Sequence, residues 1–277
     1  MTSAIDPAFC ATAAEIVLRA GDMQLAHFGV GVAVTKKGPI DLVTEVDIEI
    51  ERMFRRLIGE RFPTHAILAE ELPNHPIRDS AAGYRWVFDP IDGTVNYVHG
   101  LPFFCASLAL EIDGVPSVGA VYDPLRQELY AAERGMGARL NGAPLHVSTA
   151  DELTSALLCT GFPYDVREHV GETMELFGAF VGQARAVRRL GSAALDLCYV
   201  AAGRLDGFWE RGLHPWDTAA GALIVAEAGG RISGTRGEPF ESLAGHIVAS
   251  NGRIHEAMLA TIGACDTRST RSQSGTD

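Results

Sequence analysis

Apolar residues recur with a helical period in two segments near the start of the chain. Residues 8–28 carry apolar side chains at roughly helical spacing, and Gly29 ends that pattern. Residues 45–59 carry them at i, i+3, i+4 and i+7, which predicts a second, amphipathic helix. Thr44 is a suitable N-cap for it, and Asp47 at its third position can interact with the free N–H groups of the first turn. The apolar face of this helix is formed by Ile50, Met53, Phe54 and Leu57.

Apolar or alternating segments then follow one another and predict strands joined by tight turns. Asp113-Gly114 is a strong hairpin signal between two of them, and Asn141-Gly142 marks another tight turn. Two helices followed by hairpin-linked strands predict an α+β first half with an antiparallel sheet. The predicted strands cover residues 65–68, 84–88, 103–112, 115–122 and 127–132.

After about residue 150, strands and helices alternate, which predicts a layered α/β second half. We therefore divide the chain into a first lobe of residues 1–150 and a second lobe of residues 151–265. The segment 266–277 contains no apolar residue, so we expect it to be disordered. The alternating elements are strands at 157–162, 186–190 and 208–210 and helices at 168–182, 192–203 and 215–228.

Composition and charge narrow the class of protein. Apolar residues make up 47% of the chain and charged residues 21%, which is typical of a soluble globular protein. The formal net charge of −12 argues against nucleic acid as a partner, because nonspecific binding to it depends on basic patches. No apolar stretch approaches the roughly 20 residues of a membrane span, and charged residues interrupt any signal-like segment at the start. We expect no membrane partner.

The five cysteines are scattered along the chain and include no C-x-x-C pair. This pattern argues against structural zinc and against a disulfide framework, and it suits a reducing compartment. We therefore expect a cytoplasmic protein.

Acidic residues gather in four places, each beside an apolar segment rather than within a solvated charge run. A single Asp after a strand or in the first turn of a helix is usually a turn or capping residue. Four such places together indicate a metal site, because oxygen ligands without His or Cys at ligand spacing are typical of a site for Mg²⁺ or Mn²⁺. Such a cation would also let an acidic protein bind an anionic substrate. The four places are Asp41 with Asp47, Glu70 with Glu71, Asp89 with Asp92, and Asp217.

A Gly-Thr pair follows Asp92 directly. Gly93 would let the backbone approach a ligand closely. If a short helix begins near Thr94, its free N–H groups would form a phosphate-binding site. The Thr94 hydroxyl could then help to orient an attacking water.

Four motifs, in their order along the chain, resemble those of the inositol monophosphatase family of Mg²⁺-dependent, lithium-sensitive phosphatases. The similarity covers roughly residues 8–262. It implies the layered αβαβα sugar-phosphatase fold and a homodimer. The motifs are Asp89–Asn96 (DPIDGTVN), Trp216–Gly221 (WDTAAG) continued by Glu227–Gly230 (EAGG), Asp41–Thr44 (DLVT) followed by Asp47, and the pair Glu70-Glu71.

The resemblance implies a site for two or three Mg²⁺ ions in the first lobe. Glu70, Asp89 and the backbone carbonyl of Ile91 would hold the first ion. Asp89, Asp92 and Asp217 would hold the second, so that Asp89 bridges the two. Glu70 would also reach a third, weaker ion.

Catalytic roles follow from the same resemblance. Glu70 and Thr94 would position the nucleophilic water, and Asp47 would stand behind the metal ligands. Gly93 and Thr94 would bind the phosphate. No covalent phosphoenzyme is expected.

The second lobe would recognise the rest of the substrate. Gly191, Ser192 and Ala193 would line its ring, and Glu210 would accept hydrogen bonds from its hydroxyl groups. Lys36 falls where the family has a lysine that faces the active site. We expect residues 29–43 to form a lid that closes over the bound metal and substrate.

The sequence therefore predicts a phosphomonoesterase that hydrolyses a polyol phosphate with a metal-activated water, and myo-inositol 1-phosphate is the leading candidate. Histidinol phosphate and fructose 1,6-bisphosphate are alternatives, and Arg188 and Arg189 could bind the second phosphate of the latter. The pattern after Ser192 does not suggest the nucleotide 3′-phosphoadenosine 5′-phosphate. A regulatory binding protein on the same fold is a further alternative, although such a scaffold would have no reason to keep mutually repelling carboxylates.

Overall fold

The computed structural model describes residues 5–30, 34–36, 42–74 and 83–273. Asp41 lies outside these ranges, and so do the side chain of Lys36 and most of the predicted lid. The described chain forms two large sheets, one of seven strands and one of five, with helices around and between them. The helices are α1 (Pro7–His27), α2 (Glu45–Arg61), α3 (Thr94–Val98), α4 (Val170–Val181), α5 (Ala193–Ala201), α6 (Pro215–Glu227) and α7 (His255–Gln273).

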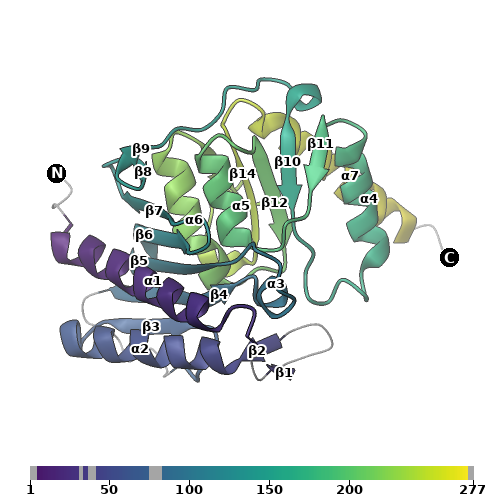
Figure 1. Cartoon of the computed structure of the whole chain (residues 1–277). Coiled ribbons are helices and arrows are strands. Elements are labelled where there is room, and N and C mark those ends of the chain that lie inside the picture. Colours follow the sequence, from purple (N-terminus) through teal and green to yellow (C-terminus); the bar gives the residue numbers. More distant parts are fainter. Residues whose placement is uncertain (1–4, 31–33, 37–41, 75–82, 274–277) are drawn as a thin grey trace.

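The helices and sheets stack in five layers (Figure 1). Helices α1 and α2 cover the outer face of the seven-stranded sheet. Helices α5 and α6 fill the space between the two sheets, and α4 and α7 cover the outer face of the five-stranded sheet. This order of layers, αβαβα, confirms the predicted fold class.

The seven-stranded sheet is antiparallel except at one edge, where β3 and β4 run parallel. Two of its hairpin turns place both central residues in the left-handed region, with φ of 53° and 78° at Asp113-Gly114 and 49° and 82° at Asn141-Gly142. Both tight turns were predicted, because these residue types tolerate positive φ. In spatial order the strands are β3 (Ala66–Ala69), β4 (Tyr84–Asp92), β5 (Cys105–Ile112), β6 (Val115–Asp123), β7 (Glu128–Glu133), β8 (Ala138–Leu140) and β9 (Ala143–Pro144).

The five-stranded sheet is mixed: its first three strands run parallel, and the other two are added by antiparallel pairing. The edge strands of both sheets are short, with four and two residues in the larger sheet and three and three in the smaller one. A separate antiparallel pair, β1 (Val34–Lys36) and β2 (Leu42–Thr44), precedes α2. In spatial order the strands of the smaller sheet are β11 (Ala186–Arg188), β10 (Leu157–Thr160), β12 (Gly207–Arg211), β14 (His246–Ser250) and β13 (Arg231–Ser233).

Helix α2 begins at the predicted cap. The Thr44 hydroxyl accepts hydrogen bonds from the N–H groups of Val46 and Asp47, and the Asp47 carboxylate accepts one from the Thr44 N–H at 2.8 Å. On the buried face, Phe54 stacks on Phe88 of β4 with 4.4 Å between ring centroids. The same face carries Glu51 into the interior, where its side chain is fully buried. The helix thus carries two fully buried acidic side chains, those of Asp47 and Glu51.

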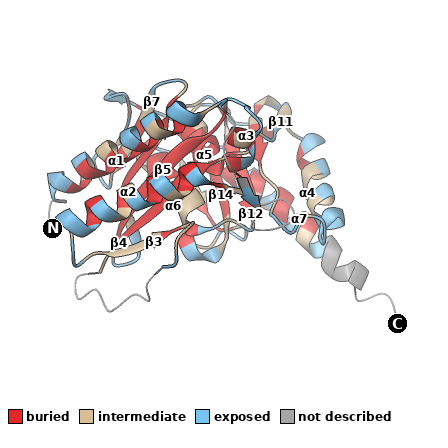
Figure 2. Ribbon diagram, turned by 60° about the horizontal axis from the view of Figure 1, so that its bottom comes forward, coloured by how far each residue is buried: buried red, intermediate tan, exposed pale blue. Residues whose placement is uncertain are grey.

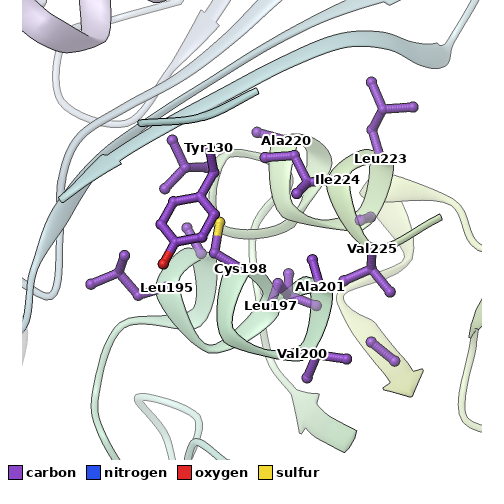
Figure 3. Packing of buried hydrophobic residues seen from close by; sticks show 14 of the residues in the cluster. Tyr130, Leu195, Leu197, Cys198, Val200, Ala201, Ala220, Leu223, Ile224 and Val225 are labelled. Carbon is purple, nitrogen blue, oxygen red and sulfur yellow. The ribbon is translucent and has the colours of Figure 1, made fainter. Parts of the chain in front are cut away.

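Small residues let the middle layer approach both neighbours closely. A Cβ on Gly221 of α6 would lie 2.7 Å from the side chain of Leu197 on α5, and one on Gly119 of β6 would lie 3.0 Å from the carbonyl oxygen of Ala220. Figure 3 shows the resulting contact between α5 and α6, with Tyr130 from the seven-stranded sheet against Cys198. The buried residues form an almost continuous band through the molecule in Figure 2. This core draws on both predicted lobes, and their boundary at residue 150 stays a prediction.

The C-terminal segment differs from the prediction. Helix α7 continues to Gln273, so the first eight residues of the tail expected to be disordered are helical. Asp266 forms an ion pair with Arg211 at 2.7 Å, which ties the start of this segment to β12. The sequence had indicated disorder because residues 266–277 lack apolar side chains, but a helix can extend beyond its packed portion. Strands β13 and β14 and helix α7 itself were not predicted.

Candidate active site

Three carboxylates meet where the end of β4 faces the first turn of α6. Asp89 and Asp92 lie at the C-terminal end of β4, and the register with β5 shifts between them. The Ile91 N–H donates a hydrogen bond to Asp89 Oδ1 at 2.9 Å. Asp217 lies at the third position of α6. Oxygens of the three carboxylates all lie within 4.8 Å of one another. The structure therefore brings Asp217 to the pair Asp89 and Asp92, which lie more than 100 positions earlier in the chain, as predicted.

The electrostatics of this cluster favour a cation. Burial is the main cause that raises the pKa of each carboxyl, well above its usual range for Asp89 and Asp217 and to about 6 for Asp92. The charged neighbours with the largest effects on these pKa values are other carboxylates, among them Glu70. Buried like charges repel one another unless a cation lies between them. Oxygen-only donors with this geometry fit a hard cation such as Mg²⁺.

Hydrogen bonds from the second half of the chain fix two of the three carboxylates. Asp92 Oδ2 accepts from the Ser192 hydroxyl at 2.6 Å and from the Ala194 N–H at 2.7 Å, at the N-terminus of α5. Asp217 Oδ2 accepts from the N–H of His214 at 2.7 Å, which closes a capping box on α6. Two helices of the second half of the chain thus orient the acidic cluster.

Gly93 connects β4 to the short helix α3 in a conformation that favours glycine. Its φ is 95°, and a Cβ there would lie 3.0 Å from the carbonyl oxygen of Phe103 and 3.2 Å from that of Gly191. The Thr94 hydroxyl, at the start of α3, donates to the Ile91 carbonyl at 2.8 Å. Ile91, a predicted metal ligand, and Thr94, which is predicted to position the water, therefore contact each other.

Asn96 was missed by the sequence analysis. Its side-chain amide donates to the carbonyl oxygens of Phe103 at 2.8 Å and Leu190 at 2.9 Å. It thus joins α3 to the segment before Gly191. The sequence signal that could have identified Asn96 was its position at the end of the DPIDGTVN motif.

A cavity of about 210 Å³ opens beside the cluster. Glu210 lies in its wall and is 8% exposed, and burial raises the pKa of this carboxyl well above its usual range. Gly161 makes room for it, because a Cβ there would lie 2.1 Å from either carboxylate oxygen. The predicted site residues that line the cavity are Asp92, Gly93, Thr94, Gly191, Ser192, Ala193, Glu210 and Asp217.

Two further residues line the cavity, Asp196 and Arg189. Asp196 had no predicted role, and Arg189 had one only for the alternative substrate fructose 1,6-bisphosphate. Asp196 of α5 is buried, and burial raises the pKa of its carboxyl well above the usual range while the Cys159 thiol lowers it. Arg189 lines the same cavity, and its charge lowers the pKa of both Asp196 and Glu210. The sequence signal for Asp196 was its position in the Ala- and Leu-rich segment after Ser192.

Asp89, Glu70 and Asp47, all within the described ranges, are not among the residues that line this cavity. Asp89 is buried, and the charges of Glu70 and Asp47 both raise its pKa. Glu70 follows the last residue of β3 and is partly exposed, whereas Asp47 is fully buried at the start of α2. The structure thus brings both acids into electrostatic range of the cluster.

Comparison with known proteins agrees with this geometry. The model of the inositol monophosphatase family matches residues 4–267. The chain belongs to this family. It is therefore placed among the phosphoric monoester hydrolases.

Relatives within the family are similar over most of their length. Inositol-1-monophosphatase of Synechocystis is 42% identical over 273 residues, which cover 95% of this chain and 94% of the relative. The Nus factor SuhB of Escherichia coli is 45% identical over 231 residues, which cover 83% and 86%. The structure of inositol monophosphatase from Anabaena superposes with a TM-score of 0.84 at 40% identity, over 93% of this chain and 96% of that one.

None of the helices in the described ranges is long and apolar enough to span a bilayer.

Proposed function

We propose that this family member is a Mg²⁺-dependent phosphomonoesterase whose substrate is myo-inositol 1-phosphate. The observation that carries the proposal is the position of the acidic cluster, which lies at one side of a cavity with Glu210 in its wall. The relative named inositol-1-monophosphatase, 42% identical over nearly the whole chain, supports the same substrate. A polyol phosphate would place its phosphate at the cluster and its hydroxyl groups toward Glu210.

The metal ligands are proposed as follows. Glu70, Asp89 and the Ile91 carbonyl would hold one ion, and Asp89, Asp92 and Asp217 would hold a second. Bound Mg²⁺ would supply charge neutralisation for the phosphate and would lower the pKa of a water molecule. Mn²⁺ could occupy the same oxygen ligands, and Glu70 could reach a third ion.

The chain's own residues would orient the reactants. Glu70 and Thr94 would hold the attacking water, and Asp47 would support them from the start of α2. Free N–H groups after Gly93 would bind phosphate oxygens. Gly191, Ser192 and Ala193 would contact the polyol ring, and Glu210 would accept hydrogen bonds from its hydroxyl groups.

Activity assays with purified protein test this proposal. We expect release of phosphate from myo-inositol 1-phosphate that requires Mg²⁺, stops in the presence of a chelator and is inhibited by Li⁺. Histidinol phosphate, fructose 1,6-bisphosphate and 3′-phosphoadenosine 5′-phosphate would be turned over with lower kcat/KM. Equal turnover with and without Mg²⁺ would refute the metal assignment, and preference for another ester would refute the substrate.

Two observations favour specific alternatives. Arg189 lines the cavity, so fructose 1,6-bisphosphate, whose second phosphate needs a cationic partner, is the second candidate substrate. The Escherichia coli relative is named a Nus factor, which favours a regulatory binding role on the same fold. Asp217→Asn separates the two kinds of function, because it would abolish a phosphatase and leave a binding surface intact.

The assembly and compartment are proposed as a homodimer in the cytoplasm. Light scattering of the full chain in reducing buffer tests the assembly. A mass of about 59 kDa, twice the 29.6 kDa of the chain, is expected, and a mass of one chain would overturn it.

A further inference from the structure

The loop that carries Glu70 is held by side chains that have no role in the proposed chemistry. This loop, residues 70–74, follows β3, the first strand in the order of the seven-stranded sheet. Helix α2 runs beside β3 in Figure 1 and provides two of the three side chains, Glu51 and Arg55. The third, Asn74, belongs to the loop itself.

Glu51 binds the backbone directly after Glu70. Its Oε2 accepts a hydrogen bond from the Glu71 N–H at 2.7 Å, and its Oε1 accepts one from the Leu72 N–H at 3.1 Å. The Glu51 side chain is fully buried, and Arg55 Nε donates to Oε1 at 2.7 Å. A buried carboxylate with three donors is firmly placed, because hydrogen bonds to an ionised group are the stronger kind.

Arg55 and Asn74 close the network around the loop. A guanidinium nitrogen of Arg55 donates to the Leu72 carbonyl at 3.0 Å and to Asn74 Oδ1 at 3.1 Å. The Asn74 side-chain amide accepts from the Ala69 N–H at 2.9 Å and donates to the Ala69 carbonyl at 2.8 Å. Asn74 therefore pairs with the last residue of β3 as a neighbouring strand would.

We propose that Glu51, Arg55 and Asn74 are positioning residues that hold Glu70 against the cluster of Asp89, Asp92 and Asp217. The proposal rests on the proposed function in one respect, namely that Glu70 is a metal ligand.

The physical reason is repulsion. Glu70 directly follows Ala69, which pairs with Phe88 just before Asp89, so Glu70 and Asp89 lie side by side at the ends of the parallel strands β3 and β4. Their carboxylates repel each other before a cation binds. On a free loop this repulsion would move Glu70 outward. Bonds to Ala69 on one side and to Glu71 and Leu72 on the other fix the backbone on both sides of Glu70. The ligand is thereby kept in place by groups that do not themselves contact the metal.

The decisive variants are Glu51→Gln and Asn74→Ala. The first substitution is nearly isosteric but would turn an amide NH₂ toward the N–H donors of the loop. Asn74 is exposed, so its truncation should not prevent folding. Glu60→Gln, which removes the same charge from an exposed position at the other end of α2, is the matched control.

Two measurements apply to each variant. Calorimetric titration of the chelator-treated protein with Mn²⁺ gives metal affinity without any substrate. Hydrogen exchange of the Glu71 and Leu72 amides reports the loop directly. We expect Glu51→Gln to weaken Mn²⁺ binding about tenfold or more, as loss of a group behind a metal ligand commonly does, and to speed exchange at both amides. Asn74→Ala should show a smaller loss of affinity, and Glu60→Gln should match the wild type.

The measurements distinguish a failure of the proposed function from a failure of this inference. Wild-type protein that binds no Mn²⁺ would refute the proposed function rather than this inference. Normal wild-type binding with unchanged Mn²⁺ affinity in both Glu51→Gln and Asn74→Ala would overturn the inference. A lowered melting temperature with unchanged affinity would show a purely structural role and would overturn it too. In active enzyme, the half-saturating Mg²⁺ concentration should rise for Glu51→Gln while the KM for the phosphate ester changes less than about twofold, because the polyol contacts lie in the other half of the chain.

Discussion

Replacement of Ser192 by alanine should separate the orientation of Asp92 from its charge. The Ser192 hydroxyl donates to Asp92 Oδ2 at 2.6 Å, and the two residues are only 2% and 8% exposed. A hydrogen bond to a charged group in such a place contributes about 1.5–3 kcal/mol. The hydroxyl also accepts a longer bond from the Leu195 N–H at 3.4 Å as the N-cap of α5, which adds about 0.5–1 kcal/mol to the loss of stability.

These magnitudes set the expected kinetic effect. Asp92 keeps the bond from the Ala194 N–H at 2.7 Å, so Ser192→Ala loosens the carboxylate without releasing it. If most of the lost energy acts in the transition state, kcat/KM falls by about 10- to 100-fold, since about 1.4 kcal/mol corresponds to a factor of ten. Ser192→Thr keeps the hydroxyl and is expected to retain activity within about threefold.

The assay compares kcat/KM at saturating Mg²⁺ with the free energy of unfolding in urea for the wild type and both variants. The expected pattern is a loss of both quantities in Ser192→Ala and recovery of both in Ser192→Thr. Ser192→Ala with wild-type kcat/KM would refute the reasoning. So would a Thr variant that is as impaired as the Ala variant, because the hydroxyl would then not be the responsible group.

Three further outcomes are expected. Asp217→Asn should lose metal-dependent turnover by several orders of magnitude. It should keep its circular dichroism spectrum, because the amide oxygen can still accept from the His214 N–H. Near-full activity of this variant at moderate Mg²⁺ would contradict the two-metal assignment. Gly93→Ala should lower the free energy of unfolding by about 2 kcal/mol, since φ is 95° and a Cβ would meet backbone oxygens; an unchanged urea midpoint would count against this. Burial lowers the pKa of His255 from 6.5 to about 4 in the folded state. The unfolded state therefore binds the extra proton first, and the wild type should lose up to about 3 kcal/mol of unfolding free energy as pH falls from 7.5 to 4, whereas His255→Gln should lose less. An equal dependence of unfolding free energy on pH in the two proteins would disprove this prediction.

Local signals in the sequence were sufficient for much of the fold. The cap at Thr44 and the turn at Asp113-Gly114 depend on residues within a few positions of each other, and both formed as predicted. Helix α7 was not predicted, although its buried residues Met258, Ile262 and Cys265 recur at helical spacing. The part of the helix after Cys265 has no apolar residue, and the helix packs on β14 and α4 through its earlier part. Propensity alone cannot supply that information.

The candidate site shows the same division. The convergence of Asp89 and Asp217 could be predicted because each lies in a recognisable motif. The hydrogen bond between Ser192 and Asp92 joins residues 100 positions apart, and no local pattern encodes it. Glu51 was not singled out, since an acidic residue in an amphipathic helix is ordinarily exposed. Only the folded chain shows that it faces inward and binds the loop after β3.

The short edge strands also affect the behaviour of the protein at high concentration. A long exposed strand edge offers unpaired N–H and C=O groups to other molecules and promotes aggregation. Here the edge strands have two to four residues, while β6 at the centre of the larger sheet has nine. On β3 the last residue, Ala69, already has its outward backbone groups bonded to the Asn74 amide. The same asparagine that closes the network around Glu70 therefore also keeps one end of the sheet from pairing with another chain.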